Sequence, residues 1–232
     1  MKPAPGAARQ ATCPTRWPGR AGTVATLLVV LCVSGSGPAV MGGGQTPQAL
    51  VDRAEADFAA GRIAESVGSF DKLAALVPDA APMLWQRGIG LYYLGRFREC
   101  AAQFASFHAA NPADVESAVW HFACVARAES PDRAKAALLA AGPDGRIMRT
   151  AIYEMFRGRR SPAEIVEAAE VSVGTARFYA AFYAGLYSEV TGDRQAALAY
   201  ITSAASDAYR SVGGFMNIVA QVHFARLTGA GA

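Results

Sequence analysis

The sequence has few of the residues that usually carry catalysis or metal binding. Only 18% of its 232 residues are charged, and its four cysteines and three histidines form neither a Cys-x-x-Cys motif nor a Cys/His cluster. Beyond residue 51, the 18 basic side chains nearly balance the 19 acidic ones. A nearly neutral chain offers no positive surface to a phosphate backbone, so we expect no nucleic-acid partner and no metal site.

The sequence also has no segment of useful length in which apolar and polar residues alternate, so we expect no β-sheet. It is rich in apolar residues, which make up 52% of the chain and suffice for one compact domain or one solenoid. These residues recur at the three- and seven-residue spacing that is typical of helices.

Residues 1–41 have the layout of a targeting leader. Four basic residues and no acidic ones precede the apolar run 21–33, which is too short to span a membrane comfortably. We expect export to a periplasm or secretory lumen, with the leader removed near Ser36 or Ala39. An uncleaved leader would be the only membrane anchor. A plastid or other organelle address stays open, because the stretch before the run also has the composition of a transit peptide.

A 34-residue repeat organises the rest of the chain. Three residues of one copy recur in the next: Gly61, Phe70 and Pro78 return as Gly95, Phe104 and Pro112. Each copy contains a helical stretch, a glycine turn, a second helical stretch and a closing proline. A helix-turn-helix unit of this period is typical of tetratricopeptide repeats, which stack into a solenoid.

The repeat frame predicts how the chain is divided. After the leader, 42–47 is expected to be a flexible linker and 48–232 the solenoid. The expected parts of the solenoid are repeats near 48–80, 81–114 and 178–206, a degenerate repeat at 115–141, an irregular helical insertion at 146–170 and a capping helix at 215–227. We therefore predict an all-α, right-handed solenoid with a C-terminal capping helix.

The run Arg87 to Arg96, the Asn111-Pro112 close and the helix around Trp120 resemble the NlpI group of bacterial envelope lipoproteins, which are tetratricopeptide proteins. The resemblance implies a non-catalytic adaptor that docks envelope hydrolases and a protease, often as a dimer. This chain departs from the group at Cys32, which follows a leucine rather than the small residue that lipid attachment requires.

Such a solenoid has a concave groove lined by the first helix of each repeat, where a partner peptide or protein usually binds. The repeat frame assigns nine residues to a partner-binding groove: Trp85, Ile89, Tyr92, Tyr93, Val119, Ala123, Tyr179, Phe182 and Leu186. Tyrosine and tryptophan are favoured anchors at interfaces. Two other interpretations stay open, namely burial of these residues by the chain's own last helix or by a second subunit.

We expect no catalytic residues and no cofactor. The glycines near Gly88 and Gly42 lack the remaining residues of a nucleotide-binding loop. Cys100 and Cys124 are expected to be small buried residues that could pair in an oxidising compartment. The predicted function is that of an adaptor. The alternatives are an enzyme with its site in the insertion 146–170, which carries several glutamates and arginines, and a self-associating scaffold.

Overall fold

The computed structural model describes residues 46–142 and 147–229, and for Ile147 the backbone only. Every regular element in these two ranges is a helix, and none is a strand. The prediction of an all-α fold is therefore confirmed. The leader and residues 42–45 of the expected linker lie outside the described residues. Within these residues, no helix is long and apolar enough to cross a membrane.

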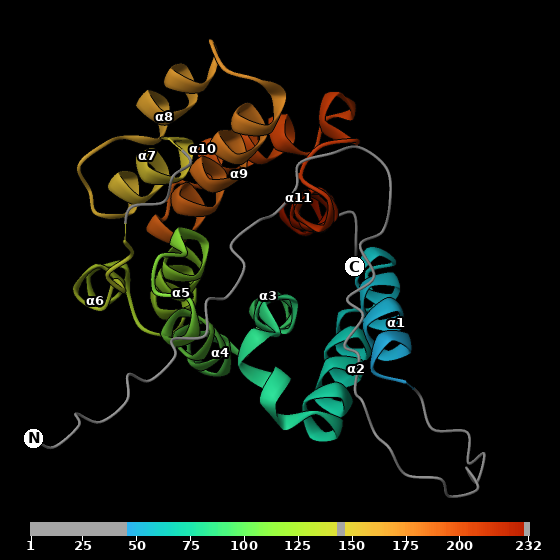
Figure 1. Cartoon of the computed structure of the whole chain (residues 1–232). Helices are drawn as coiled ribbons and strands as arrows, with labels where there is room; N and C mark the ends of the chain where they lie inside the picture. The colour runs from blue at the N-terminus through green and yellow to red at the C-terminus, as the bar shows by residue number, and fades with distance from the viewer. Residues whose placement is uncertain (1–45, 143–146, 230–232) are drawn as a thin grey trace, which may run out of the picture. The chain divides into compact units, whose positions relative to one another are not determined.

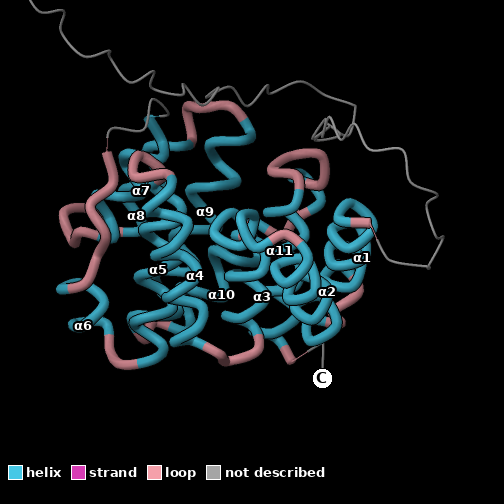
Figure 2. Tube along the Cα trace, turned by 60° about the horizontal axis from the view of Figure 1, so that its bottom comes forward, coloured by secondary structure: helices cyan, strands magenta, loops and turns pink. Residues whose placement is uncertain are grey.

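Eleven α-helices and two short 3₁₀ helices make up the described ranges (Figures 1 and 2). The α-helices of the first half are α1 (Pro47–Ala59), α2 (Ile63–Leu76), α3 (Trp85–Tyr93), α4 (Phe97–Ala110), α5 (Val115–Ala128) and α6 (Pro131–Ala136). Those of the second half are α7 (Ile147–Phe156), α8 (Pro162–Ala169), α9 (Gly174–Thr191), α10 (Arg194–Ala204) and α11 (Phe215–Thr228). The 3₁₀ helices are η1 (Pro78–Met83) and η2 (Asp207–Tyr209).

Three helical hairpins turn at glycines. The turns between α1 and α2, α3 and α4, and α9 and α10 contain Gly61, Gly95 and Gly192, whose φ angles are 76°, 73° and 97°. A side chain is strained at such angles, so these turns require glycine. The first helix begins earlier than the sequence analysis expected, because Thr46 caps α1 through its hydroxyl and Pro47 is the first helical residue. Both had been assigned to the flexible linker.

Two of these hairpins close around a glycine on the first helix. A Cβ on Gly88 would lie 2.8 Å from the ring of Phe104, and one on Gly185 would lie 2.6 Å from the side chain of Ile201. In both hairpins the glycine and the large residue are 16 positions apart, and the first hairpin has the small residue Ala54 at the position of Gly88. The same close approach therefore recurs in different hairpins.

The remaining helices follow local capping signals. Ser130 and Pro131 begin α6, and Ser161 forms a capping box with Glu164 at the start of α8. Helices α7 and α8 pack against each other, and both contact α9. The expected insertion is thus a pair of short helices over its described residues, and Arg146 lies outside them.

A disulfide joins α4 to α5. Cys100 and Cys124 have a Cα–Cα separation of 5.8 Å, and neither is exposed to solvent. The sequence left this pairing open. It closes a loop across the boundary between two successive hairpins and fixes their relative position.

Helix α11 lies against the side of the hairpins formed by their first helices α1, α3 and α9, which we call the inner side, and not only at one end. Its neighbours include both the last hairpin, through α10, and the first hairpin, through α1. Its side chains also meet rings on α3 and α9. The sequence predicted a helix that covers one end, and the structure shows a helix that contacts both the first and the last hairpin (Figure 1).

Candidate functional site

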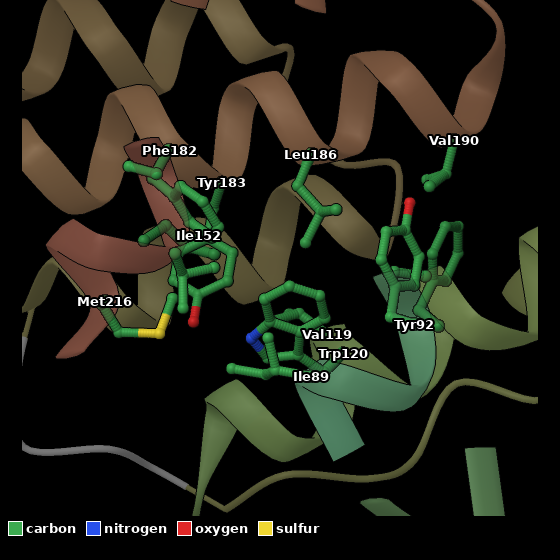
Figure 3. Packing of buried hydrophobic residues seen from close by; sticks show 14 of the residues in the cluster. Ile89, Tyr92, Val119, Trp120, Ile152, Phe182, Tyr183, Leu186, Val190 and Met216 are labelled. Carbon is green, nitrogen blue, oxygen red and sulfur yellow. The ribbon is translucent and has the colours of Figure 1, made fainter. Parts of the chain in front are cut away.

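The nine predicted groove residues divide into two sets. Six are core residues with at most 1% exposure: Ile89, Tyr92, Val119, Ala123, Phe182 and Leu186. Three are half-buried: Trp85, Tyr93 and Tyr179. In Figure 3, Leu186 of α9 points toward Trp120 and Ile89, which come from α5 and α3. An open groove along the six buried residues is thus not what the structure has, because α9 packs over α3 and α5 and fills it.

The inner surface that remains next to the half-buried residues is occupied by α11. Phe215 inserts between Phe58 of α1 and Trp85 of α3, with ring centroids 5.1 Å and 5.5 Å away. Further along α11, His223 contacts the rings of Tyr93 at 5.7 Å and Phe182 at 6.1 Å. For Trp85, Tyr93 and Phe182, the structure therefore shows contact with the chain's own last helix, one of the alternatives left open by the sequence.

The sequence of α11 explains why it can lie there. Apart from Gln221 and the terminal Thr228, no residue of α11 is fully exposed, and Met216, Val219 and Leu227 belong to the core. A helix that is apolar on nearly all sides is stable only when other elements surround it. Gln221 donates to the carbonyl of Ala205, which ties α11 to the end of α10 at 2.6 Å.

A buried charged cluster forms where α3, α5, α9 and α11 meet. Its centre is Glu189 of α9, whose side chain is only 9% exposed. The hydroxyl of Tyr92 donates to Glu189 at 2.9 Å. Nε2 of His223 lies 3.2 Å from the carboxylate, and guanidinium nitrogens of Arg226 and Arg127 lie 3.4 Å and 3.6 Å from it.

These neighbours hold Glu189 in its ionised form. Burial alone raises the pKa of Glu189, but the hydrogen bond and charge of His223, the charge of Arg226 and the hydroxyl of Tyr92 outweigh it and lower the pKa to about 2. On the other side of the cluster, Nδ1 of His223 lies 2.9 Å from the hydroxyl of Tyr93. Both ring nitrogens of this fully buried histidine therefore face polar groups.

The sequence analysis missed this cluster. Its members are scattered over positions 92 to 226, so no spacing brings them together. Two signals were available: Glu189 is the only charged residue of the mainly apolar stretch 178–192, and His223 interrupts the apolar last helix. A lone charged residue in a core helix predicts a buried partner without telling which residue supplies it.

A second buried ion pair lies beneath the half-buried Tyr179. Arg149 of α7 is 4% exposed, and its guanidinium lies 2.8 Å from Glu116 of α5 and 3.5 Å from the ring centre of Tyr179. The hydroxyl of Tyr183 donates to the same carboxylate. Burial, together with the nearby Glu116, raises the pKa of Tyr183 well above its usual range. These contacts fix α7 between α5 and α9, so Tyr179 has a packing role here.

The described residues contain no group of three or more His, Cys, Asp or Glu residues arranged to hold a metal ion. Nδ1 of His108 lies at hydrogen-bond distance, 2.9 Å, from the hydroxyl of Ser117, and its Nε2 lies 3.2 Å from the carbonyl oxygen of Ala140. Contacts of this kind are typical of a core histidine. A shallow depression of about 350 Å³ is open to solvent, and it is lined by Gly95, Arg96, Phe97, Arg98, Glu99, Arg127 and Ala128.

The glutamates of the insertion have local structural roles. Glu154 pairs with Arg157 and Arg159 at 3.1 Å and 3.2 Å. Glu164 accepts a hydrogen bond from the backbone of Ser161, which lowers the pKa of its carboxyl. These contacts are typical of helix ends and solvated surfaces.

In comparisons with known proteins, no protein-family model and no curated protein matches this sequence significantly.

Proposed function

We propose that the protein is a non-catalytic adaptor of the tetratricopeptide type, which binds a partner protein or peptide on the inner side of its helical hairpins. The observation that carries this proposal is α11 itself. An apolar helix lies on this surface, with Phe215 held between Phe58 and Trp85 and with His223 and Arg226 directed to Glu189. A surface that accommodates one helix in this way has the aromatic slots and the buried polar anchor that helix recognition uses.

The repeat structure supports the assignment to the tetratricopeptide class. The 34-residue spacing, the glycine turns at Gly61 and Gly95 and the recurring contact of Gly88 with Phe104 are what that class requires. The resemblance to the NlpI group favours a bacterial envelope location. The disulfide between Cys100 and Cys124 supports a compartment that is oxidising, because buried disulfides are rare in the reducing cytosol.

Photo-crosslinking in the native cell tests the proposal. A photoreactive aromatic amino acid would replace Trp85, which is half-buried at the edge of the α11 surface. In two control variants it would replace Ala102 or Ser106, which are exposed on the outer face of α4. We expect a defined crosslinked protein from position 85 and none of that mass from the control positions.

The opposite pattern would count against the proposal. If position 85 yields only products with the mass of the chain itself, whether uncrosslinked or crosslinked internally to α11, while the variant is folded and correctly located, the inner side is not a partner surface. If the only product has twice the mass of the chain, the surface serves self-association, and the scaffold interpretation replaces the adaptor.

A further inference from the structure

We infer that α11 is a built-in occupant of a helix-binding surface, and that the protein's partner is a helix carrying basic side chains where α11 carries His223 and Arg226. This inference rests on the proposed adaptor function and specifies the chemistry of its partner. Six residues contact α11 through rings or charges, and we call this surface the cradle: Phe58, Trp85, Tyr92, Tyr93, Phe182 and Glu189.

The anionic centre of the cradle is organised without α11. Glu189 accepts a hydrogen bond from the hydroxyl of Tyr92 on α3 and lies 3.6 Å from the guanidinium of Arg127 on α5. Neither of these groups belongs to α11. Only His223 and Arg226 come from α11. If α11 leaves, the carboxylate therefore keeps a donor and one positive charge, and it can accept a cation from another helix without rearrangement.

Helix α11 is attached to the hairpins at its N-terminal end, through a segment that contains two glycines. It is the last described helix, and it enters the cradle through Gly213 and Gly214, whose φ angles of 83° and 55° allow the backbone to bend sharply. The segment from Ala205 to Gly214 contains only a short 3₁₀ turn. Release of α11 therefore breaks no covalent link within the hairpins, and the disulfide between α4 and α5 remains in place.

The contacts of α11 are specific as well as apolar. His223 meets Glu189 and Tyr93, and Asn217 donates to the carbonyl of Tyr209 at 3.0 Å. Buried polar contacts of this kind set the register of a helix and its choice of partner, in addition to any contribution to stability. A helix whose only role was to cover an apolar surface would not need a histidine with both ring nitrogens facing polar groups at this depth.

The pattern of α11 defines the partner. An aromatic residue fits between Phe58 and Trp85, and basic side chains follow eight and eleven positions later, where α11 has His223 and Arg226. Positions separated by eight and eleven residues lie on one face of a helix. The partner is therefore an amphipathic helix with one aromatic anchor and a basic pair on its apolar face.

A competition experiment on the full chain tests the inference. A fluorescent peptide with the sequence 213–229 is titrated with wild-type protein and with the Arg226→Ala variant, in which the protein's own α11 has lost one ion pair to Glu189. We expect the peptide to bind the variant about tenfold more tightly, as loss of one such pair from the competing helix implies. Arg98→Ala is the matched control, because Arg98 is exposed outside the cradle, and it should bind the peptide as the wild type does.

Two further variants separate the inference from trivial effects. Arg194→Ala removes the hydrogen bond that the Arg194 side chain at the start of α10 donates to the carbonyl of Leu227 in α11. This substitution weakens the attachment of α11 without changing the cradle, so it too should increase peptide binding. Adding Glu189→Gln to the Arg226→Ala variant should abolish the increase, because the anionic centre is lost. A peptide with glutamate at the position of Arg226 should not bind.

The inference is overturned if the peptide binds folded Arg226→Ala and Arg194→Ala no better than the wild type, or if the charge-reversed peptide binds as well as the original. It is also overturned if either variant forms a dimer that the peptide dissociates, because the helix bound in the cradle is then the α11 of a second copy. A crosslinked partner at position 85 together with a failed competition would leave the adaptor function standing and remove only the role of α11.

Discussion

Substitution of Gly185 by alanine tests the helix packing that recurs between hairpins. A Cβ at this position would lie 2.6 Å and 2.7 Å from two side-chain carbons of Ile201 and 3.2 Å from its backbone nitrogen. Ile201 is fully buried, so it cannot move aside into solvent. Overpacking of this kind costs about 1–3 kcal/mol, while alanine regains about 1 kcal/mol of helix propensity. We expect a net loss of stability.

Gly68→Ala provides a matched control that isolates the steric cost. Gly68 is also inside a helix, but a Cβ there would have no neighbour within 4 Å. The propensity gain is therefore common to both variants, and the difference between their unfolding free energies should be the clash alone, about 1–3 kcal/mol. Urea unfolding followed by circular dichroism measures both values.

A double variant refines the test. Ile201→Val removes one of the carbons that the new Cβ would meet, so it should cost less in the Gly185→Ala background than in the wild type, by about 0.5 kcal/mol or more. The packing argument would be refuted if Gly185→Ala were as stable as Gly68→Ala, or if the two substitutions were additive.

Three other predictions concern the charged cluster and the disulfide. Glu189→Gln should lower the free energy of unfolding by about 3 kcal/mol in a urea titration, because it leaves the cations around Glu189 without their counter-charge. The control Glu167→Gln, at an exposed position, should change it by less than about 0.5 kcal/mol. Folding lowers the pKa of Glu189 from 4.5 to about 2, so its contribution of about 3 kcal/mol to the free energy of unfolding should be complete above pH 5 and be lost as the pH falls toward 2. Unfolding titrations between pH 6 and 2 should therefore show a smaller loss of stability with acid in Glu189→Gln than in the wild type. An unchanged acid dependence would contradict the assignment. Replacing both Cys100 and Cys124 by serine should cost about 3–4 kcal/mol, the value expected for closing a loop with a sequence separation of 24, and a reductant should destabilise the wild type but not this variant.

The hairpins could be predicted from the sequence because their determinants are local. Glycine is required at Gly61 and Gly95 by the turn, and the small residue at Gly88 is required by the ring of Phe104, so both leave a periodic trace in the chain. Helix α11 was predicted within one residue of its observed range of Phe215–Thr228 for the same reason. Local patterns of this kind identify elements and their faces.

The place of α11 and the charged cluster could not be predicted in the same way. A helix that is apolar on nearly all sides carries no signal for which neighbour it covers, so Phe215 gave no indication of the slot between Phe58 and Trp85. Glu189 and His223 come together only through the tertiary fold. The groove was assigned from the repeat frame, which placed Phe182 and Leu186 along it and predicted a last helix at 215–227, but gave no indication that α9 packs over Ile89 or that α11 lies beside it.

Native-state hydrogen exchange on the full chain measures most directly whether α11 is a separable occupant of the cradle. In low concentrations of urea, the amides of Val219 and Val222 in α11 would be compared with those of Ala184 and Leu186 in α9. The account predicts that the α11 amides exchange through a partial opening whose free energy is lower than that of global unfolding, while the α9 amides exchange only when the whole array unfolds. Exchange of both sets with the same free energy and the same urea dependence would contradict it, because α11 would then be a permanent part of the core.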